Sequence, residues 1–213
     1  MNEHMTDTVE MLNKLLGHAK NPYLLFGADR SSILCMYLVR KYVSRSVSVL
    51  FIDTKNHFEE VYLFLKKLKK LWGIEIVERA NPSEQGKQPT KPSKQECCQL
   101  RKAHVLEGAI RDLHIDVLVT GMQPNALRSY SRKELEKSQM SRIIINPIET
   151  WPDDEVRSAV KEWNLPRCSL WTLGLDWIDC EPCTKIPESI ANLNDSQSER
   201  QKVMRKLNSL GYC

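Results

Sequence analysis

Short apolar runs alternate along this chain with segments whose apolar residues recur at helical spacing. Three runs predict buried strands, over residues 23–26, 46–53 and 116–120, and two others predict a short strand over residues 74–77 and a further strand over residues 142–145. Continuous apolar runs of this length are typical of strands that are covered on both faces, as in parallel sheets.

The segments between these runs have the period of helices. In residues 57–72 one face carries a stripe of large apolar side chains, Phe58, Val61, Leu65, Leu68 and Trp72. Similar patterns predict helices over residues 6–19, 29–43, 97–114 and 150–163. Strands that alternate with helices favour an α/β fold, a parallel sheet with helices on both faces.

Residues suited to ligand binding follow three of the predicted strands, where open parallel sheets bind their ligands. They are Gly27, Ala28, Asp29, Arg30, Ser31, Ser32, Asp53, Thr54, Thr120 and Gly121. The two serines suit a phosphate, although serines at this place often only cap a helix. Asp53 suits a ribose or a metal, but an acid that ends a strand is as often a turn residue.

The composition restricts the class of protein without choosing a function. The chain has 213 residues, 41% hydrophobic and 27% charged, with a formal net charge of +4. No apolar run approaches the roughly 20 residues that cross a membrane. The first residues are polar and acidic, so we expect a cytoplasmic protein with no membrane partner. The mild charge gives no indication of nucleic-acid binding.

The seven cysteines carry the most specific chemistry. In a reducing compartment, clustered cysteines indicate metal or redox chemistry rather than disulfides. Cys97 and Cys98 are adjacent, and Cys180 and Cys183 enclose a Glu-Pro pair. Two such pairs suit tetrahedral zinc, but neighbouring helical side chains diverge by roughly 100°. A [4Fe–4S] cluster, with four separate ligand corners, tolerates that divergence better.

Several segments in this order resemble a known family: FGADRSSIL, FIDTKNHFEEVY, CCQLRK, VLVTG, NPIETWPDDEV and CEPCT. They are similar to the adenylyl-sulfate reductase branch of the sulfonucleotide reductases, in the PP-loop (adenine nucleotide alpha hydrolase-like) superfamily. The resemblance implies a PP-loop domain with an iron–sulfur site over residues 1–186 and a C-terminal tail over residues 187–213. It implies a [4Fe–4S] cluster on Cys97, Cys98, Cys180 and Cys183, with Lys102 close enough to temper the cluster's charge.

The resemblance also implies an activity. Such enzymes bind a sulfated adenine nucleotide over the carboxyl edge of the sheet, which here implies residues 27–32, Asp53, Thr54, Gly121 and Arg128. A cysteine thiolate of the C-terminal tail attacks the sulfur, and AMP leaves. A thioredoxin-like or small thiol then releases sulfite. Cys213 is the only cysteine after Cys180 and Cys183, so it is the candidate nucleophile. The alternative is that it has no catalytic role and belongs to a frayed terminus.

The chain departs from the family's pattern near the expected nucleotide. Leu25 replaces a serine, Arg30 replaces an acid, and Lys55 replaces a glycine. The arginine-rich run expected after Gly121 is missing, as is the Glu-Cys-Gly-Leu-His motif of the tail. Arg30 could supply the lost positive charge or block the old pocket.

These departures leave three functions open. The first is reduction of adenylyl sulfate or a related nucleotide. The second is a PP-loop enzyme that activates a substrate with ATP or transfers sulfur to an acceptor such as tRNA. The third is a non-catalytic relative in which the cluster is a structural clasp or a redox sensor. Self-association into a homo-oligomer is compatible with all three.

Overall fold

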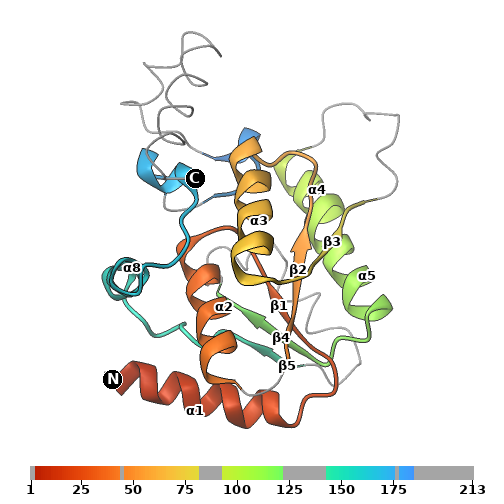
Figure 1. Ribbon diagram of the computed structural model, residues 1–213. Helices are drawn as coiled ribbons and strands as arrows, with labels where there is room; N and C mark the ends of the chain where they lie inside the picture. Colours follow the sequence, from red (N-terminus) through yellow and green to blue (C-terminus); the bar gives the residue numbers. More distant parts are fainter. Residues whose placement is uncertain (1–2, 44–45, 82–92, 122–142, 176–177, 185–213) are drawn as a thin grey trace.

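A five-stranded parallel sheet forms the centre of the protein (Figure 1). The computed structural model describes residues 3–43, 46–81, 93–121, 143–175 and 178–184. The strand order is β3-β2-β1-β4-β5. The strands are β1 (Pro22–Leu25), β2 (Ser48–Ile52), β3 (Ile76–Arg79), β4 (Val117–Thr120) and β5 (Ile143–Ile145). Every neighbouring pair is parallel, so the carboxyl ends of all five strands share one edge.

Helices connect these strands. The longer ones are α1 (Glu3–Gly17), α2 (Arg30–Tyr42), α3 (Glu59–Trp72), α5 (His104–Asp112) and α8 (Asp153–Glu162). Before α5 the chain forms a short α4 (Lys94–Cys98) and one π-helical turn, η2 (Gln99–Ala103). Two short 3-10 turns, η4 (Ser169–Leu173) and η5 (Glu181–Cys183), follow α8.

The two faces of the sheet pack against different helices because side chains alternate along each strand. On one face Leu24 and Phe51 join the larger core, which includes buried residues of α1, α2, α3 and α8. On the other face Leu25 and Leu50 pack with α5 through Leu106. The predicted α/β architecture with helices on both faces is therefore confirmed.

Element boundaries differ from the prediction where caps decide them. The helix expected over residues 97–114 begins three residues earlier, at Lys94. Ser93 caps it, and Ser93 and Glu96 form a reciprocal capping box that satisfies the first backbone N–H groups. The first helix likewise begins at Glu3 rather than at residue 6.

Within the described ranges, no helix has the length and apolar character that spanning a bilayer requires.

Candidate functional site

The loop between β1 and α2 presents the N-terminus of a helix at the carboxyl edge of the sheet. Asp29 is the N-cap of α2, and its Oδ1 accepts a hydrogen bond from the Ser32 backbone N–H at 2.6 Å. The Ser32 hydroxyl is buried and donates to the Asp29 carbonyl at 3.0 Å. Burial raises the pKa of Asp29 above its usual value, against the hydrogen bonds from the serines. Both side chains thus complete the helix start.

Gly121 allows the end of β4 to approach this loop closely. A Cβ atom there would lie 2.5 Å from the Ser31 carbonyl oxygen and 2.8 Å from the Ser32 nitrogen, both backbone atoms. Only glycine fits against a backbone at this distance. The loops after the first and fourth strands therefore lie against each other at this contact.

Arg30 and Trp171 connect the same loop to η4. The Arg30 guanidinium carbon lies 5.2 Å from the Trp171 ring centroid, and its Nη2 donates to the Trp171 carbonyl at 3.4 Å. The indole N–H of buried Trp171 donates to the Ala28 carbonyl at 3.2 Å. Ala28 has a φ of +61°, a conformation that non-glycine residues seldom adopt. The indole contact therefore fixes an unusual turn.

Asp53 and Lys55 form a second group, immediately after β2. Asp53 is buried and accepts hydrogen bonds from the Lys55 N–H at 2.8 Å, the Lys55 Nζ at 2.5 Å and the Tyr62 hydroxyl at 2.8 Å. Burial alone would raise the pKa of Asp53, but these donors outweigh it and hold the pKa below its usual value. Lys55, where the resembling family has glycine, has a φ of +60°.

The cysteine pairs lie on two segments that one ion pair connects. Cys97 and Cys98 end α4, and Cys180 and Cys183 flank η5. Lys102, in the π-turn after the first pair, donates to Asp179, which precedes the second pair. Only 8% of the Lys102 side chain is exposed. A carboxylate here compensates an ammonium that would otherwise be buried without a counter-charge.

The second cysteine pair also contacts the end of β2. The Cys180 thiol lies 3.2 Å from the Thr54 hydroxyl oxygen, and the Glu181 N–H donates to the Asn56 carbonyl at 2.7 Å. Arg101 donates from Nη1 to the Thr54 carbonyl at 2.7 Å. The strand end, the π-turn and the cysteine loop therefore form one unit.

Charges between these segments bear on the thiols. Burial raises the pKa of Cys98, and the Lys102 ammonium opposes that effect, while Asp179, Cys183 and Cys97 add to it. Burial likewise raises the pKa of Cys180, against the Thr54 hydroxyl and Lys102. A ligand that binds thiolates must therefore offset this cost, because the protein alone favours the neutral thiols.

The donor set is compatible with either a metal ion or a cluster. Cysteine thiolates are ligands of both zinc and iron–sulfur clusters. Within the described part of the chain, no three His, Cys, Asp or Glu side chains converge on one metal position. Adjacent side chains on a helix diverge by roughly 100°, which applies to Cys97 and Cys98 at the end of α4, and Lys102 lies in the turn that follows. The four separate corners of a cluster would accommodate that divergence.

With this geometry in view, the sequence can be compared with known proteins. The sequence profile of the phosphoadenosine phosphosulfate reductase domain matches residues 21–186. This chain belongs to that reductase family. The match covers the β1–α2 loop, the end of β2 and both cysteine pairs, and it confirms the family resemblance found in the sequence.

Curated relatives in the family are adenosine 5'-phosphosulfate reductases. The protein of Oceanobacillus iheyensis is 25% identical over 185 residues, which cover 82% of this chain and 74% of the relative. That of Shouchella clausii is 23% identical over 194 residues, covering 86% of this chain and 78% of the relative.

Solved structures show the same PP-loop fold. Phosphoadenylyl-sulfate reductase from Candida auris, in a phosphate complex, has a TM-score of 0.70 at 19% identity, covering 84% of this chain and 90% of that one. The U34-tRNA thiolase NcsA from Methanococcus maripaludis, with its [4Fe-4S] cluster, has a TM-score of 0.58 at 15% identity, covering 97% and 78%. At these identities the likeness establishes the fold alone.

The predicted residues fall into three groups. Those of the β1–α2 loop meet Gly121, and Thr54 meets the cysteine loop. Arg128 and Cys213 lie outside the described residues, so their roles stay predictions. The sequence analysis missed Arg101, Asp179 and Trp171, whose contacts join segments distant in sequence. The Arg-Lys pair that follows the vicinal cysteines was the one signal for Arg101.

Proposed function

We propose that this protein is an iron–sulfur reductase that converts adenylyl sulfate, or a closely related sulfated adenine nucleotide, to sulfite and AMP with external thiols. One observation carries the proposal. The cysteine pairs are joined through Lys102 and Asp179, and Cys180 contacts Thr54, directly at the carboxyl end of β2. That edge is where parallel α/β sheets bind nucleotides.

In this proposal the nucleotide lies across the ends of β1, β2 and β4. The backbone N–H groups of the β1–α2 loop that Asp29 does not cap would face its phosphate, and Gly121 lets the end of β4 pack against that loop. Asp29 caps the helix, so cationic side chains must supply the charge for an anion. Arg30, Arg101 and the predicted Arg128 are the candidates, because guanidinium groups suit sulfate and phosphate oxygens.

The proposed nucleophile is the Cys213 thiolate. It attacks the nucleotide's sulfur, the S–O bond to AMP breaks, and AMP leaves with the electron pair. The enzyme then carries an S-sulfocysteine. The thiolate of a thioredoxin-like or small-molecule dithiol attacks the Cys213 sulfur, and sulfite leaves with the electron pair. The reductant's second thiol resolves the mixed disulfide, so two thiols become one disulfide for each sulfite formed.

Cys97, Cys98, Cys180 and Cys183 would hold a [4Fe–4S] cluster. When bound, it supplies a fixed anionic centre beside the nucleotide edge. The Lys102 ammonium tempers that charge, and Asp179 orients the ammonium. Arg101 and Thr54 connect this centre to the end of β2, so a change at the cysteines is transmitted to the nucleotide edge.

The test begins with anaerobic purification, followed by counting of iron and sulfide and by assay of sulfite release from adenylyl sulfate. We expect about four irons for each chain. Cys180→Ser and Cys183→Ser should lose them. Cys168→Ala should retain them, because Cys168 is buried, lies 3.9 Å from the Glu60 carbonyl of α3 and belongs to neither cysteine pair. Zinc in place of iron would overturn the cluster.

The nucleophile is tested separately. Cys213→Ser should bind adenylyl sulfate and retain iron but lose sulfite release. The control is Cys35→Ala, at a buried position of α2, which should keep its activity. Full activity of Cys213→Ser would refute this assignment. Turnover of ATP to AMP, with no sulfite from adenylyl sulfate, would instead favour an ATP-activating enzyme.

A further inference from the structure

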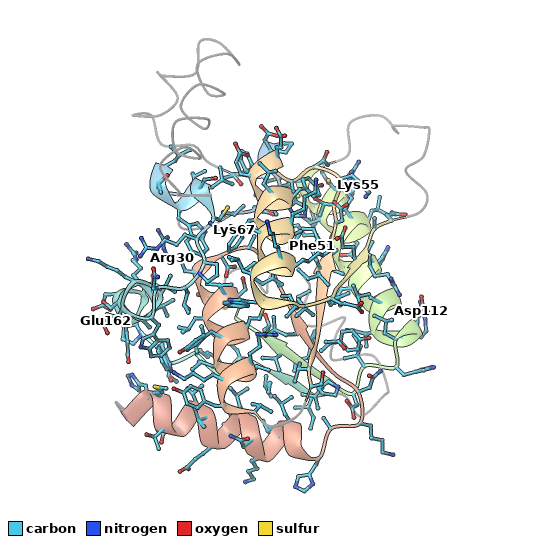
Figure 2. The ribbon with its side chains drawn as sticks, viewed as in Figure 1. Arg30, Phe51, Lys55, Lys67, Asp112 and Glu162 are labelled. Atoms are coloured by element: carbon cyan, nitrogen blue, oxygen red, sulfur yellow. The ribbon has the colours of Figure 1, made fainter. Side chains whose placement is uncertain are left out.

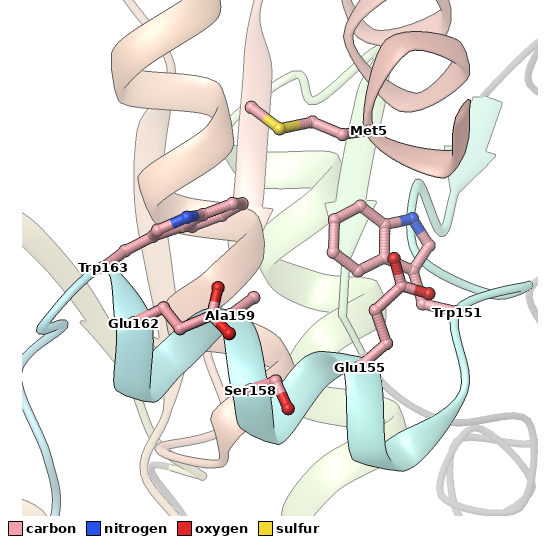
Figure 3. A pocket seen from close by; sticks show the side chains of 7 residues that line it. All are labelled: Met5, Trp151, Glu155, Ser158, Ala159, Glu162 and Trp163. Carbon is pink, nitrogen blue, oxygen red and sulfur yellow. The ribbon is translucent and has the colours of Figure 1, made fainter. Parts of the chain in front are cut away.

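A pocket of about 360 Å³ lies between α1 and α8, and the functional site uses none of its residues (Figure 3). Met5 of α1 forms one wall, and Ala159 of α8 lies opposite. Trp151 and Trp163, which flank α8 in sequence, stand at its two ends. The pocket is thus a short trough along one helix, with an indole ring at each end.

Both indole rings are held in place by contacts outside the trough. The Trp151 N–H donates to the Thr8 hydroxyl at 3.0 Å, and the ring is buried. The Trp163 ring lies 5.3 Å from the Tyr37 ring, centroid to centroid. Neither ring has to be ordered on binding, which removes part of the entropic cost of holding a ligand.

Two carboxylates line the trough, Glu155 and Glu162. Residues seven apart lie on the same face of a helix, about 10 Å apart along its axis. The Glu155 carboxylate accepts from His4 Nδ1 at 2.7 Å. None of the seven residues that line the trough is lysine or arginine. The trough therefore has a carboxylate near each end, that of Glu155 paired with His4, and Met5, Ala159 and the Ser158 hydroxyl between them.

Helix stability explains Glu155 but not Glu162. An acid in the first turn of α8 interacts favourably with the positive end of the helix dipole, and Glu155 is one of three acids there. Glu162 is the last residue of α8, where a carboxylate faces the negative end and a basic residue would be favoured. A cation bound in the trough would compensate that unfavourable position.

From this geometry we infer that the trough is a binding site for a linear alkyl diamine. One ammonium pairs with Glu162 and faces the Trp163 ring, with which a cation interacts favourably, and the other takes the place of His4 at the Glu155 carboxylate. The methylene chain lies along Met5 and Ala159, where it is removed from contact with water. The inference is independent of the proposed reductase function, because it uses no residue of that site.

Calorimetric titration of the full-length protein with 1,5-diaminopentane tests the site. We expect saturable binding, and at least tenfold weaker binding of pentylamine and of 1,5-pentanediol. Glu162→Gln should weaken the diamine at least fivefold, and Trp163→Leu should abolish binding. The control is Glu10→Gln, which changes the net charge by the same amount as Glu162→Gln but at an exposed position of α1. It should leave the affinity for the diamine within twofold of the native value.

Three outcomes would overturn the inference. They are no saturable binding of the diamine, equal effects of Glu162→Gln and Glu10→Gln, and binding of the diol as tight as that of the diamine. N-acetyl-lysine amide carries one ammonium, so binding of this compound as tightly as the diamine would refute the pairing with two carboxylates. If Trp163→Leu fails to fold, Trp163→Phe replaces it in the titration. That variant should lose part of the affinity for the diamine.

Discussion

The Lys102 ammonium and the Asp179 carboxylate form an ion pair that joins the helical segment of one cysteine pair to the loop of the other. Asp179 also accepts from the Cys180 N–H at 2.8 Å. Figure 2 shows side chains filling the space between the sheet and its helices, and the Lys102 side chain is 8% exposed while that of Asp179 is 33% exposed. This ion pair is therefore one of the contacts that fix the relative position of the two cysteine segments, together with those of Arg101 and Cys180 to Thr54.

Asp179→Asn should destabilise the protein because it removes the carboxylate that pairs with the largely buried Lys102 ammonium. We expect a loss of about 1–3 kcal/mol in the free energy of unfolding, measured by urea denaturation. The matched control is Glu78→Gln in the exposed pair with Lys69, which should cost less than about 1 kcal/mol. Equal losses in the two variants would show that Asp179 is not a structural counter-ion.

Gly121→Ala should be destabilising because its methyl group would collide with the backbone of Ser31. We expect a loss of about 1–3 kcal/mol in the free energy of unfolding and weaker nucleotide binding at the β1–α2 loop. In Gly108→Ala of α5, the added methyl group would meet only Arg111, at 3.9 Å. That control should gain about 0.5–1 kcal/mol from helix propensity. Thermal denaturation should show a loss of stability in Gly121→Ala and a gain in Gly108→Ala. A gain of stability in both variants would contradict the predicted collision at Gly121.

The sequence predicted the sheet because its signals are local. The run Val117, Leu118 and Val119 is apolar throughout, as is typical of a strand in a parallel sheet covered on both faces. Placing Gly27 and Gly121 at one edge then follows from the parallel topology alone. Candidate ligand-binding positions could therefore be proposed before any contact was known.

The remaining features depend on tertiary contacts. No local pattern marks the π-turn after Cys98, which rotates Arg101 and Lys102 relative to an unbroken α-helix. Single π-turns within helices occur frequently at functional sites. Asp179 and Trp171 have no motif, and their roles appear only where η2 and the β1–α2 loop meet them.

Trp171→Phe should loosen the β1–α2 loop because the Ala28 carbonyl loses its indole donor. We expect faster hydrogen exchange across residues 27–32 and a stability loss of about 1–3 kcal/mol. Trp72→Phe is a matched control. Arg40 lies 5.5 Å from the Trp72 ring and donates to its carbonyl at 2.9 Å, as Arg30 does to Trp171. Exchange in the loop should not change in the control. If it quickens equally in both, the indole contact does not hold the loop.

Asp116 gives the protein a stability that depends on pH. Its carboxylate accepts from the backbone N–H groups of Lys20 and Asn21, which join the starts of β1 and β4. Burial would raise the pKa of Asp116, but these donors outweigh it and lower the pKa below its unfolded value. The stabilisation is therefore complete above the unfolded pKa of about 4 and is lost as the pH falls through the lower, folded pKa.

Asp116→Asn should remove this stabilisation. At pH 7 we expect a loss of about 1 kcal/mol, because the carboxylate is partly exposed to solvent. The difference from the native protein should shrink as the pH falls below about 4, because the unfolded carboxyl takes up a proton there and the native carboxylate does so only at a lower pH. Urea denaturation at pH 7, 5 and about 3 measures this gap. Asp112→Asn, at an exposed position, should change stability by less than about 0.5 kcal/mol at each pH. A gap for Asp116→Asn that is constant, or widens in acid, would rule out the charged hydrogen bonds as its source.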